Sequence, residues 1–321
     1  MKKRLLLVAL GLLCLPARAQ DYPTRPITLV VPAAAGGPTD TLARTLGAAM
    51  HPVLKQTFLI DNSGGAGGVI GINKAAKAKA DGYTLLIYHL GMATAPALYR
   101  KLPYDTLNDF DYVGLVADVP MLLIAKKATA ARNFAEFLDY LKVNQDKLAY
   151  SHAGVGSASF LCGLLFMNAT QTSFTQVGYK GTGPAMNDLV GGQVDFMCDQ
   201  ATNSLPQVRS GNVKAYGVTT AARLASMPDL PTLDEQGLKG FDLVVWNGLF
   251  APRGIPRPAL DKLVAALQVA VQDPTFRTRM ADLSSEPAAP ARATPEALRD
   301  VLKSEVAKWT PIIHKAGVHA D

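Results

Sequence analysis

The sequence predicts an α/β fold with a mostly parallel sheet, and three observations support this prediction. Short apolar segments rich in β-branched residues alternate with amphipathic segments of helical period. Glycine-rich loops follow several of the predicted strands. The 321 residues are 49% hydrophobic and 18% charged, which supplies enough apolar material for about two domains of ~150 residues each. In open α/β sheets of this kind, ligands bind beyond the carboxyl ends of the strands.

The first block of the chain reads β-α-β-α-β. Residues 27–31 form a continuous apolar run between two prolines, as expected of a buried parallel strand. Apolar residues then recur every four positions over residues 42–50 and indicate a helix. Residues 57–61 and 83–88 are the next two predicted strands, and a glycine-rich loop at 64–68 lies between them.

A second block repeats this organisation, and the chain then ends in helices. Residues 134–141 carry apolar residues at helical spacing and indicate an amphipathic helix. The predicted strands of this block are residues 121–124, 148–151, 174–179, 193–198 and 213–219. Two late helices contain Leu263 and Leu302. We expect both to pack on the first block, because the chain must cross back near residues 246–250 after the second sheet.

The first nineteen residues have the pattern of a secretory signal peptide. A basic segment, Lys2–Arg4, precedes an apolar run, Leu5–Leu15, and Ala17–Ala19 supplies the small-x-small cleavage pattern. This apolar run is too short to cross a bilayer as a stable helix. We therefore expect cleavage after Ala19 and export to the periplasm.

The basic charge of the chain lies mostly in this leader. The whole sequence has 32 basic and 26 acidic residues, a formal charge of +6. Four of the basic residues fall within residues 1–19, which contain no acid, so 28 basic and 26 acidic residues remain. A mature chain so close to neutral does not favour a nucleic-acid partner.

Two cysteines, Cys162 and Cys198, remain after removal of the leader. An even pair in an oxidising compartment predicts a disulfide. Metal binding is the alternative, but the chain has no C-x-x-C pair and its five histidines show no ligand spacing. We expect neither a metal nor a cofactor.

The glycine-rich loops do not match the motifs of nucleotide-binding proteins or serine hydrolases. Ile70 stands where a dinucleotide fingerprint starting at Gly65 needs glycine, and the chain has no Gly-Lys pair from which to build a P-loop. Ser157 does not lie in a G-x-S-x-G motif. A hydrolase would have to assemble a triad with His89 or His152, and it stays open as an alternative.

The same loops suit a carboxylate ligand better. Each opens a predicted helix, whose first turn carries unpaired N–H groups and the positive end of the helix dipole. Glycine allows a ligand to approach the backbone closely. Thr39, Ser157, Ser159 and Thr182 add hydroxyl donors beside these turns. Three such loops in two blocks predict an anion-binding cleft that requires neither arginine nor a metal.

Ordered motifs along nearly the whole chain carry a resemblance to a known family. The motifs are Tyr22–Ile27, Val31-Pro32, Gly36–Asp40, Asp61-Asn62, Gly65–Gly68, Asp81–Leu85, Gly154–Ser159, Tyr179–Ala185, Gly191–Asp195, Leu230–Thr232, Lys308-Trp309 and Ala316–Val318. With them, the chain resembles the periplasmic solute-binding proteins of tripartite tricarboxylate transporters, often called the Bug family.

The resemblance implies a type II periplasmic-binding fold, in which two α/β domains close around one ligand. After the signal peptide at 1–19, domain one would comprise residues 20–123 and 247–321, and domain two residues 124–246. The implied ligand is a small organic acid. The implied partners are the large and small integral-membrane subunits of the transporter, with the binding protein acting as a monomer.

The resemblance also implies a set of ligand-binding residues and no catalytic ones. The implied set is Gly36, Gly37, Thr39, Asp40, Asn62 and Ala66 in domain one, and Ser157, Ser159, Tyr179 and Asp199 in domain two. To these we add His89, which closes the third strand. A ligand sensor for a membrane kinase would share all of these residues and remains an alternative to a transport receptor.

Overall fold

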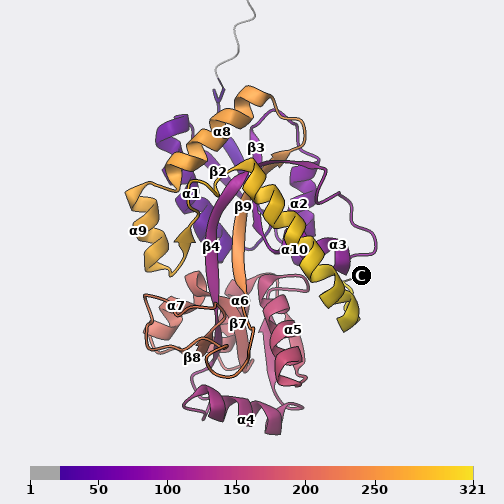
Figure 1. The fold of residues 1–321 in the computed structure, drawn as a ribbon, viewed down its shortest axis with the longest axis vertical. Helices are drawn as coiled ribbons and strands as arrows, with labels where there is room; N and C mark the ends of the chain where they lie inside the picture. Colours follow the sequence, from indigo (N-terminus) through magenta and orange to yellow (C-terminus); the bar gives the residue numbers. More distant parts are fainter. Residues whose placement is uncertain (1–21, 321) are drawn as a thin grey trace, which may run out of the picture.

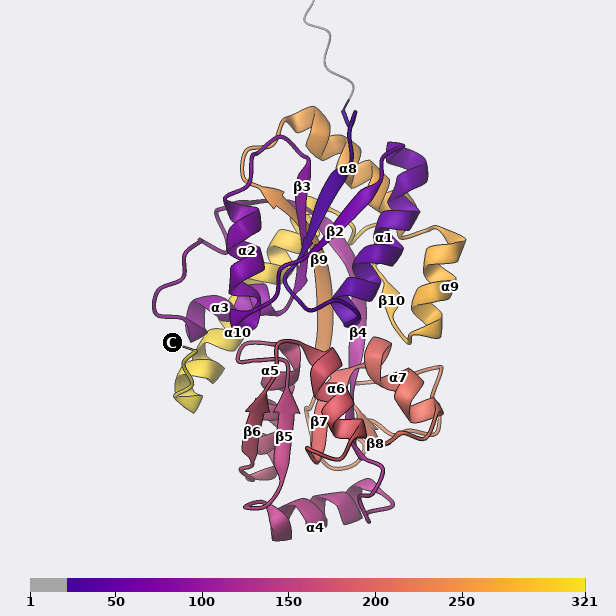
Figure 2. The same cartoon turned by 180° about the vertical axis from the view of Figure 1, so that it is seen from behind.

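The computed structural model describes residues 22–320, so the expected signal peptide lies outside the described residues. Two α/β lobes are stacked along the longest axis of the molecule, as Figures 1 and 2 show from opposite sides. We call them the first lobe, which contains the N-terminal strands, and the second lobe, which contains the middle of the chain.

The first lobe is centred on three parallel strands, β1 (Ile27–Val31), β2 (Phe58–Asn62) and β3 (Thr84–His89). Each begins within one residue of its predicted position. The apolar residues of β1 are fully buried, as its continuous β-branched run predicts. The connecting elements are α1 (Pro38–Leu54), η1 (Ala66–Gly68), α2 (Val69–Ala76) and α3 (Gly91–Leu98).

The second lobe repeats this plan. Its strands are β5 (Ala149–His152), β6 (Thr175–Gly178), β7 (Phe196–Gln200) and β8 (Val213–Val218). Its helices are α4 (Phe134–Asn144), α5 (Ala158–Thr170), α6 (Thr182–Val190) and α7 (Ala201–Arg209). Strand β5 pairs in parallel with β6 on one side and β7 on the other. The predicted α/β organisation of the second block is therefore confirmed.

Two long strands connect the lobes, β4 (Phe110–Lys126) and β9 (Val244–Pro252). They pair antiparallel with each other, and β9 also pairs antiparallel with β3. The second half of β4 pairs antiparallel with β7 and β8. The sheet is thus parallel among β1, β2 and β3 and among β5, β6 and β7, and antiparallel at β4, β8 and β9. The sequence did not indicate this mixture. The predicted strand at 121–124 is only part of β4, and β9 was not predicted as a strand.

The C-terminal elements return to the first lobe. They are α8 (Arg257–Ala270), α9 (Pro274–Asp282), β10 (Glu286–Pro287) and α10 (Pro295–Ala316). Helix α8 packs on α1 and β4, and α10 packs on α3 and β4. Leu263 and Leu302 are both fully buried, and Leu263 lies in one apolar cluster with Leu42 of α1. The prediction that the late helices pack on the first block is confirmed.

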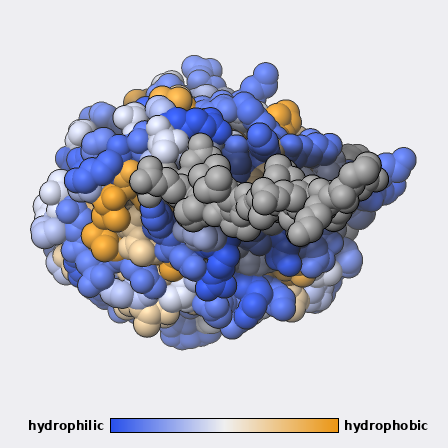
Figure 3. All heavy atoms as spheres, turned by 90° about the horizontal axis from the view of Figure 1, so that it is seen from above, coloured by the Kyte–Doolittle hydropathy of each residue, from blue (hydrophilic) through white to orange (hydrophobic). Residues whose placement is uncertain are grey.

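The surface at the outer end of the first lobe is mostly hydrophilic, with separate small apolar patches (Figure 3). Among residues 22–320, no helix combines the length and apolar character needed to span a membrane.

A disulfide lies in the second lobe. Cys162 of α5 and Cys198 of β7 are bonded, with their Cα atoms 6.1 Å apart. Both side chains are buried. The bond fixes α5, which begins at the Ser157 loop, to the strand that ends at Asp199.

Candidate ligand-binding site

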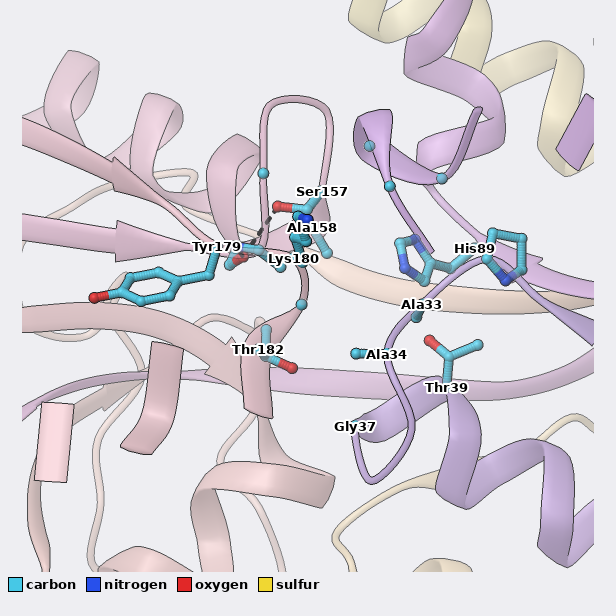
Figure 4. A pocket seen from close by; sticks show the side chains of 18 of the residues that line it. Ala33, Ala34, Gly37, Thr39, His89, Ser157, Ala158, Tyr179, Lys180 and Thr182 are labelled. Carbon is cyan, nitrogen blue, oxygen red and sulfur yellow. Dashed lines mark hydrogen bonds between the residues drawn. The ribbon is translucent and has the colours of Figure 1, made fainter. Parts of the chain in front are cut away.

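A cavity of about 270 Å³ lies between the two lobes. The loop or last residues at the carboxyl end of each parallel strand in both lobes contribute to its wall, as is general for open α/β sheets. Figure 4 shows the first-lobe loop that carries Ala33, Ala34 and Gly37 opposite Ser157 and Thr182 of the second lobe. The predicted edge of the sheet is therefore where the cavity is found.

Five helices have their N-cap residue in the wall of this cavity: α1, α2, α5, α6 and α7. No side chain caps the first turn of α1, α6 or α7, whose N-cap residues are Gly37, Gly181 and Gln200. The N–H groups of these first turns have no partner within their helices. An anionic group in the cavity would meet these donors and the positive ends of the helix dipoles. Among the lining residues that the structure describes, Lys180 is the single cation.

Gly36, Asp40 and Asn62 do not line the cavity but hold the loop that does. The Gly36 N–H and the Arg44 side chain donate to Asp40 Oδ2 at 2.9 and 3.0 Å, and Asn62 Nδ2 donates to Asp40 Oδ1 at 3.1 Å. Burial opposes ionisation of Asp40, but these hydrogen bonds lower its pKa below the usual value. Asp40 is thus an ionised carboxylate that fixes the β1–α1 loop from behind.

Ser157 and Ser159 lie at the start of α5 in the opposite wall. Ser157 Oγ accepts the N–H of Phe160 at 3.2 Å and lies 3.1 Å from Ser159 Oγ. Ser159 Oγ accepts the N–H of Ala153 at 2.9 Å. The backbone therefore holds both hydroxyls in place. Since one of the two donates to the other, the pair has one hydroxyl proton left for a ligand.

His89 lines the cavity from the first lobe and is buried. Its Nδ1 accepts the N–H of Gly91 at 3.2 Å, and its ring stacks on that of Tyr88. Burial lowers the pKa of His89 to about 3, so the ring is neutral near pH 7. Because Nδ1 accepts a hydrogen bond, the proton of the neutral ring resides on Nε2. His89 is therefore a neutral N–H donor.

Tyr179 contributes to the cavity wall, but its side chain is directed away from the cavity (Figure 4). Its hydroxyl donates to Asp188 Oδ2 at 2.6 Å. This hydrogen bond raises the pKa of Tyr179 to about 12. The neighbouring Lys180 is exposed at the cavity wall.

Asp199, at the end of β7, is the one acidic residue in the described wall, and it has no exposed surface. Its two oxygens accept the N–H of Gln200 at 2.8 Å and the Nδ2 of Asn203 at 2.5 Å. Burial raises the pKa of Asp199 to about 7. The carboxyl group therefore lies just behind the wall and changes charge near neutral pH.

Small residues from the two lobes meet around the cavity. A β-carbon placed on Gly156 would lie 2.9 Å from Leu98 Cδ1, and one on Gly37 would lie 3.7 Å from Thr182 Oγ1. A β-carbon on Gly67 would overlap the carbonyl oxygen of Val155. The lobes are thus in direct contact, and the structure is a closed form.

Eight of the eleven predicted ligand-binding residues line the cavity. They are Gly37, Thr39, Ala66, His89, Ser157, Ser159, Tyr179 and Asp199. Tyr88, Tyr99, Gln200 and Ala320 also line it and were not predicted. Tyr88 and Gln200 are sequence neighbours of the predicted residues His89 and Asp199, so their positions at strand ends could have indicated them. Tyr99 and Ala320 lie outside the glycine-rich loops, and no local pattern marks them.

The sequence matches the family model described as the tripartite tricarboxylate transporter family receptor over residues 42–318. The chain belongs to this family. A relative from Agrobacterium vitis, the UPF0065 protein in the TAR-I ttuE-ttuC' intergenic region, is 46% identical over 99% of this chain and 92% of its own length.

Solved structures of this receptor family agree with the fold. The periplasmic binding protein BugD is 48% identical, with a TM-score of 0.91 over 93% of this chain and 99% of its own. MatC from Rhodopseudomonas palustris, with bound malate, is 42% identical, with a TM-score of 0.87 over 91% of this chain and 100% of its own. Rpa4515 from R. palustris, with adipate, is 33% identical, with a TM-score of 0.89 over 93% and 99%. The expected Bug-family membership and periplasmic-binding fold are confirmed.

Proposed function

We propose that this receptor-family protein captures a small organic carboxylate between its lobes in the periplasm and delivers it to the membrane subunits of a tripartite tricarboxylate-type transporter. The observation that carries the proposal is the convergence of five helix N-termini on a cavity with one cation among its described lining residues. Each hydrogen bond from an N–H group to the carboxylate would contribute about 1.5–3 kcal/mol.

The ligand class follows from cavity size and from the relatives. A cavity of about 270 Å³ is slightly smaller than most ligand pockets, which span roughly 300–1,000 Å³. Malate and adipate, bound by two relatives, are dicarboxylates. We therefore propose a dicarboxylate of similar size for this chain.

Within this proposal the predicted residues have different roles. Gly37, Thr39 and Ala66 would present backbone N–H groups, and His89 its Nε2–H, from the first lobe. From the second lobe, the hydrogen-bonded pair Ser157 and Ser159 would donate its one remaining hydroxyl proton. Gly36, Asp40 and Asn62 would position the first loop, Tyr179 would contribute backbone, and Asp199 would act through its charge behind the wall.

The domain boundaries are part of the proposal. Domain one would be residues 20–123 and 247–321, and domain two residues 124–246. The pairing of Asp118 with Trp246 and of Met121 with Gln200 supports them, because the partner of β4 changes between lobes at this point.

We propose no catalytic step. The Ser157 hydroxyl is engaged with the backbone of α5 and with Ser159, and no hydrogen bond joins it to a histidine among residues 22–320. Family membership favours a transport receptor over a sensor for a membrane kinase or a hydrolase.

Native mass spectrometry of freshly purified mature protein should detect a retained acid. Calorimetry should then show binding of malate, succinate or adipate and no binding of the matched neutral diamides, which have similar shapes without the charge. Binding of the diamides in preference to the acids would refute the carboxylate assignment.

The transport role, the location and the oligomeric state need tests of their own. Deletion of the gene should abolish uptake of the bound acid, and the membrane subunits should be recovered with the cross-linked binding protein. The periplasmic fraction should contain a chain that begins at Gln20. Light scattering should report a monomer of the mature mass. Normal uptake in the deletion strain would favour the sensor.

A further inference from the structure

The last described residues form a short tail that leaves α10 and returns toward the cavity. Helix α10 ends at Ala316, and Gly317 follows with φ +65°, a left-handed conformation that glycine adopts at little cost. In Figures 1 and 2 the end of α10 lies beside α3 and reaches the level of α5 in the second lobe. We call Val318–Ala320 the tail.

The tail is attached to the first lobe at the cavity. The N–H of Ala320 donates to the carbonyl oxygen of Leu98, the last residue of α3, at 2.9 Å. Ala320 itself lines the cavity between the lobes, as does Tyr99, which follows Leu98. The tail therefore supplies part of the cavity wall, beside the loops of the two lobes.

The same point touches the second lobe. Leu98 Cδ1 lies 2.9 Å from the position of a β-carbon on Gly156. Val318 lines an adjoining cavity of about 500 Å³, whose other described lining residues, among them His152, Phe160 and Lys180, all belong to the second lobe. The tail thus lies where the two lobes meet, and it lines two cavities that residues of the second lobe also line.

We propose that the tail is a wall of the ligand site that closes the cavity beside α3 and slows release of the bound carboxylate. This inference rests on the proposed carboxylate function. The tail retains Leu98 at its contact with Gly156 through the Ala320–Leu98 hydrogen bond, and Ala320 fills the side of the cavity. Removal of the tail opens the ligand site without removing any group that binds the carboxylate.

The first test compares the mature protein with a variant that ends at Gly317, using malate and adipate as probes. Stopped-flow measurements should show a dissociation rate about tenfold or more above that of the full chain, since most affinity changes appear in the dissociation rate. Malate affinity should fall more than adipate affinity, because the longer acid gains room. Equal dissociation rates for the two proteins would overturn the proposal.

A pair of point variants isolates the anchoring hydrogen bond. Ala320→Pro removes the N–H that donates to Leu98, and Ala320→Gly keeps it. The proline variant should release malate about 2- to 10-fold faster, the effect of one ordinary hydrogen bond, while the glycine variant stays close to the parent. Similar rates in both variants would show that the anchor does not control release.

A measurement without ligand keeps the tail proposal separate from the carboxylate assignment. Val155 lines both cavities, and both cysteines of the described chain are in the disulfide, so Val155→Cys introduces a single free thiol. A small maleimide should label this thiol faster when the tail is absent, with thermal stability compared as a control. Unchanged labelling would overturn the tail as a wall, whichever ligand the protein binds.

Discussion

Gly181 of the second lobe meets Ala34 of the first so closely that a β-carbon on Gly181 would lie 2.9 Å from Ala34 Cβ. Neither atom is at the end of a flexible side chain, so a methyl group at this position can be accommodated only if the lobes move apart. The absence of a side chain at Gly181 is therefore a condition for closure.

Gly181→Ala should hold the cleft open and weaken binding of the carboxylate by about tenfold or more, equivalent to ~1.4 kcal/mol. Calorimetry measures the affinity, and small-angle scattering should show that added ligand no longer compacts the variant.

Gly237→Ala is the matched control for this substitution. Gly237 also has a positive φ, +106° against +132° for Gly181, but nothing lies within 4 Å of its β-carbon position. Both variants carry backbone strain, and only the one at Gly181 should lose affinity. Equal affinities in the two variants would contradict the closing role of Gly181.

Gly37→Val should abolish binding, while Lys180→Ala should weaken it less than about tenfold, as for an exposed charge. Gly37 has φ −82°, so valine is not strained there, but its branches would enter the space between Ala34 and Thr182 and cover the first turn of α1. A loss of about two charge-assisted hydrogen bonds corresponds to about a hundredfold in affinity or more. Calorimetry with malate separates the two outcomes, and the reverse order of effects would indicate a side-chain salt bridge instead of a backbone site.

Asp199 should make stability fall as pH rises from about 4 to 7. Its folded-state pKa of about 7 exceeds the usual unfolded value of ~3.9, so the folded protein binds the extra proton in this window. The free energy of unfolding of the parent relative to Asp199→Asn should fall by up to about 1.4 kcal/mol per pH unit. Urea unfolding at several pH values measures this difference.

The comparison with Asp199→Asn is needed because buried His89 changes the stability with pH in the opposite direction. Its pKa of about 3 makes stability rise with pH up to about 6.5, the ordinary histidine value. This contribution is common to both proteins and cancels. A difference in unfolding free energy that stays constant from pH 4 to 8 would show that Asp199 does not titrate as described.

The disulfide should stabilise the second lobe by about 3–4 kcal/mol in the chain-entropy model for the separation of 36 residues. Unfolded, unreduced protein should contain no reactive thiol. The double variant Cys162→Ala/Cys198→Ala should lose this stability. The free energy of unfolding of the parent should equal that of the double variant only in the presence of a reductant. Two reactive thiols in unreduced protein would exclude the bond.

The strands of the first lobe were predictable because each carries its own local signal. Residues 27–31 are apolar except for Thr28 and are bounded by prolines, and the structure buries all of them but the half-buried Thr28. In β9, Asn247 and Gly248 interrupt the apolar residues, and no proline stands directly before the strand. Its strand conformation depends on pairing with β3 and β4, which are more than a hundred residues away in the sequence.

The candidate site divides in the same way. Gly37 and Ser157 lie in glycine-rich loops after strands, a local pattern that indicates a ligand edge. Asp40 and Asn62 occur in the same loops, yet their side chains bond to each other behind the wall, and only tertiary contacts determine that direction. Ala320 reaches the cavity through packing of α10 on α3, a relationship that no local pattern specifies.

The insertion of the second lobe between β4 and β9 has a consequence for the order of folding. β3 pairs with β1 on one side and with β9 on the other. The sheet of the first lobe is therefore complete only after Leu86 of β3 has paired with Phe250 of β9. Contacts between such distant residues form slowly, because closing a long loop loses chain entropy before the new contacts stabilise the structure. The second lobe closes over a shorter stretch of chain. During folding, therefore, the second lobe can form while β3 still lacks its pairing with β9.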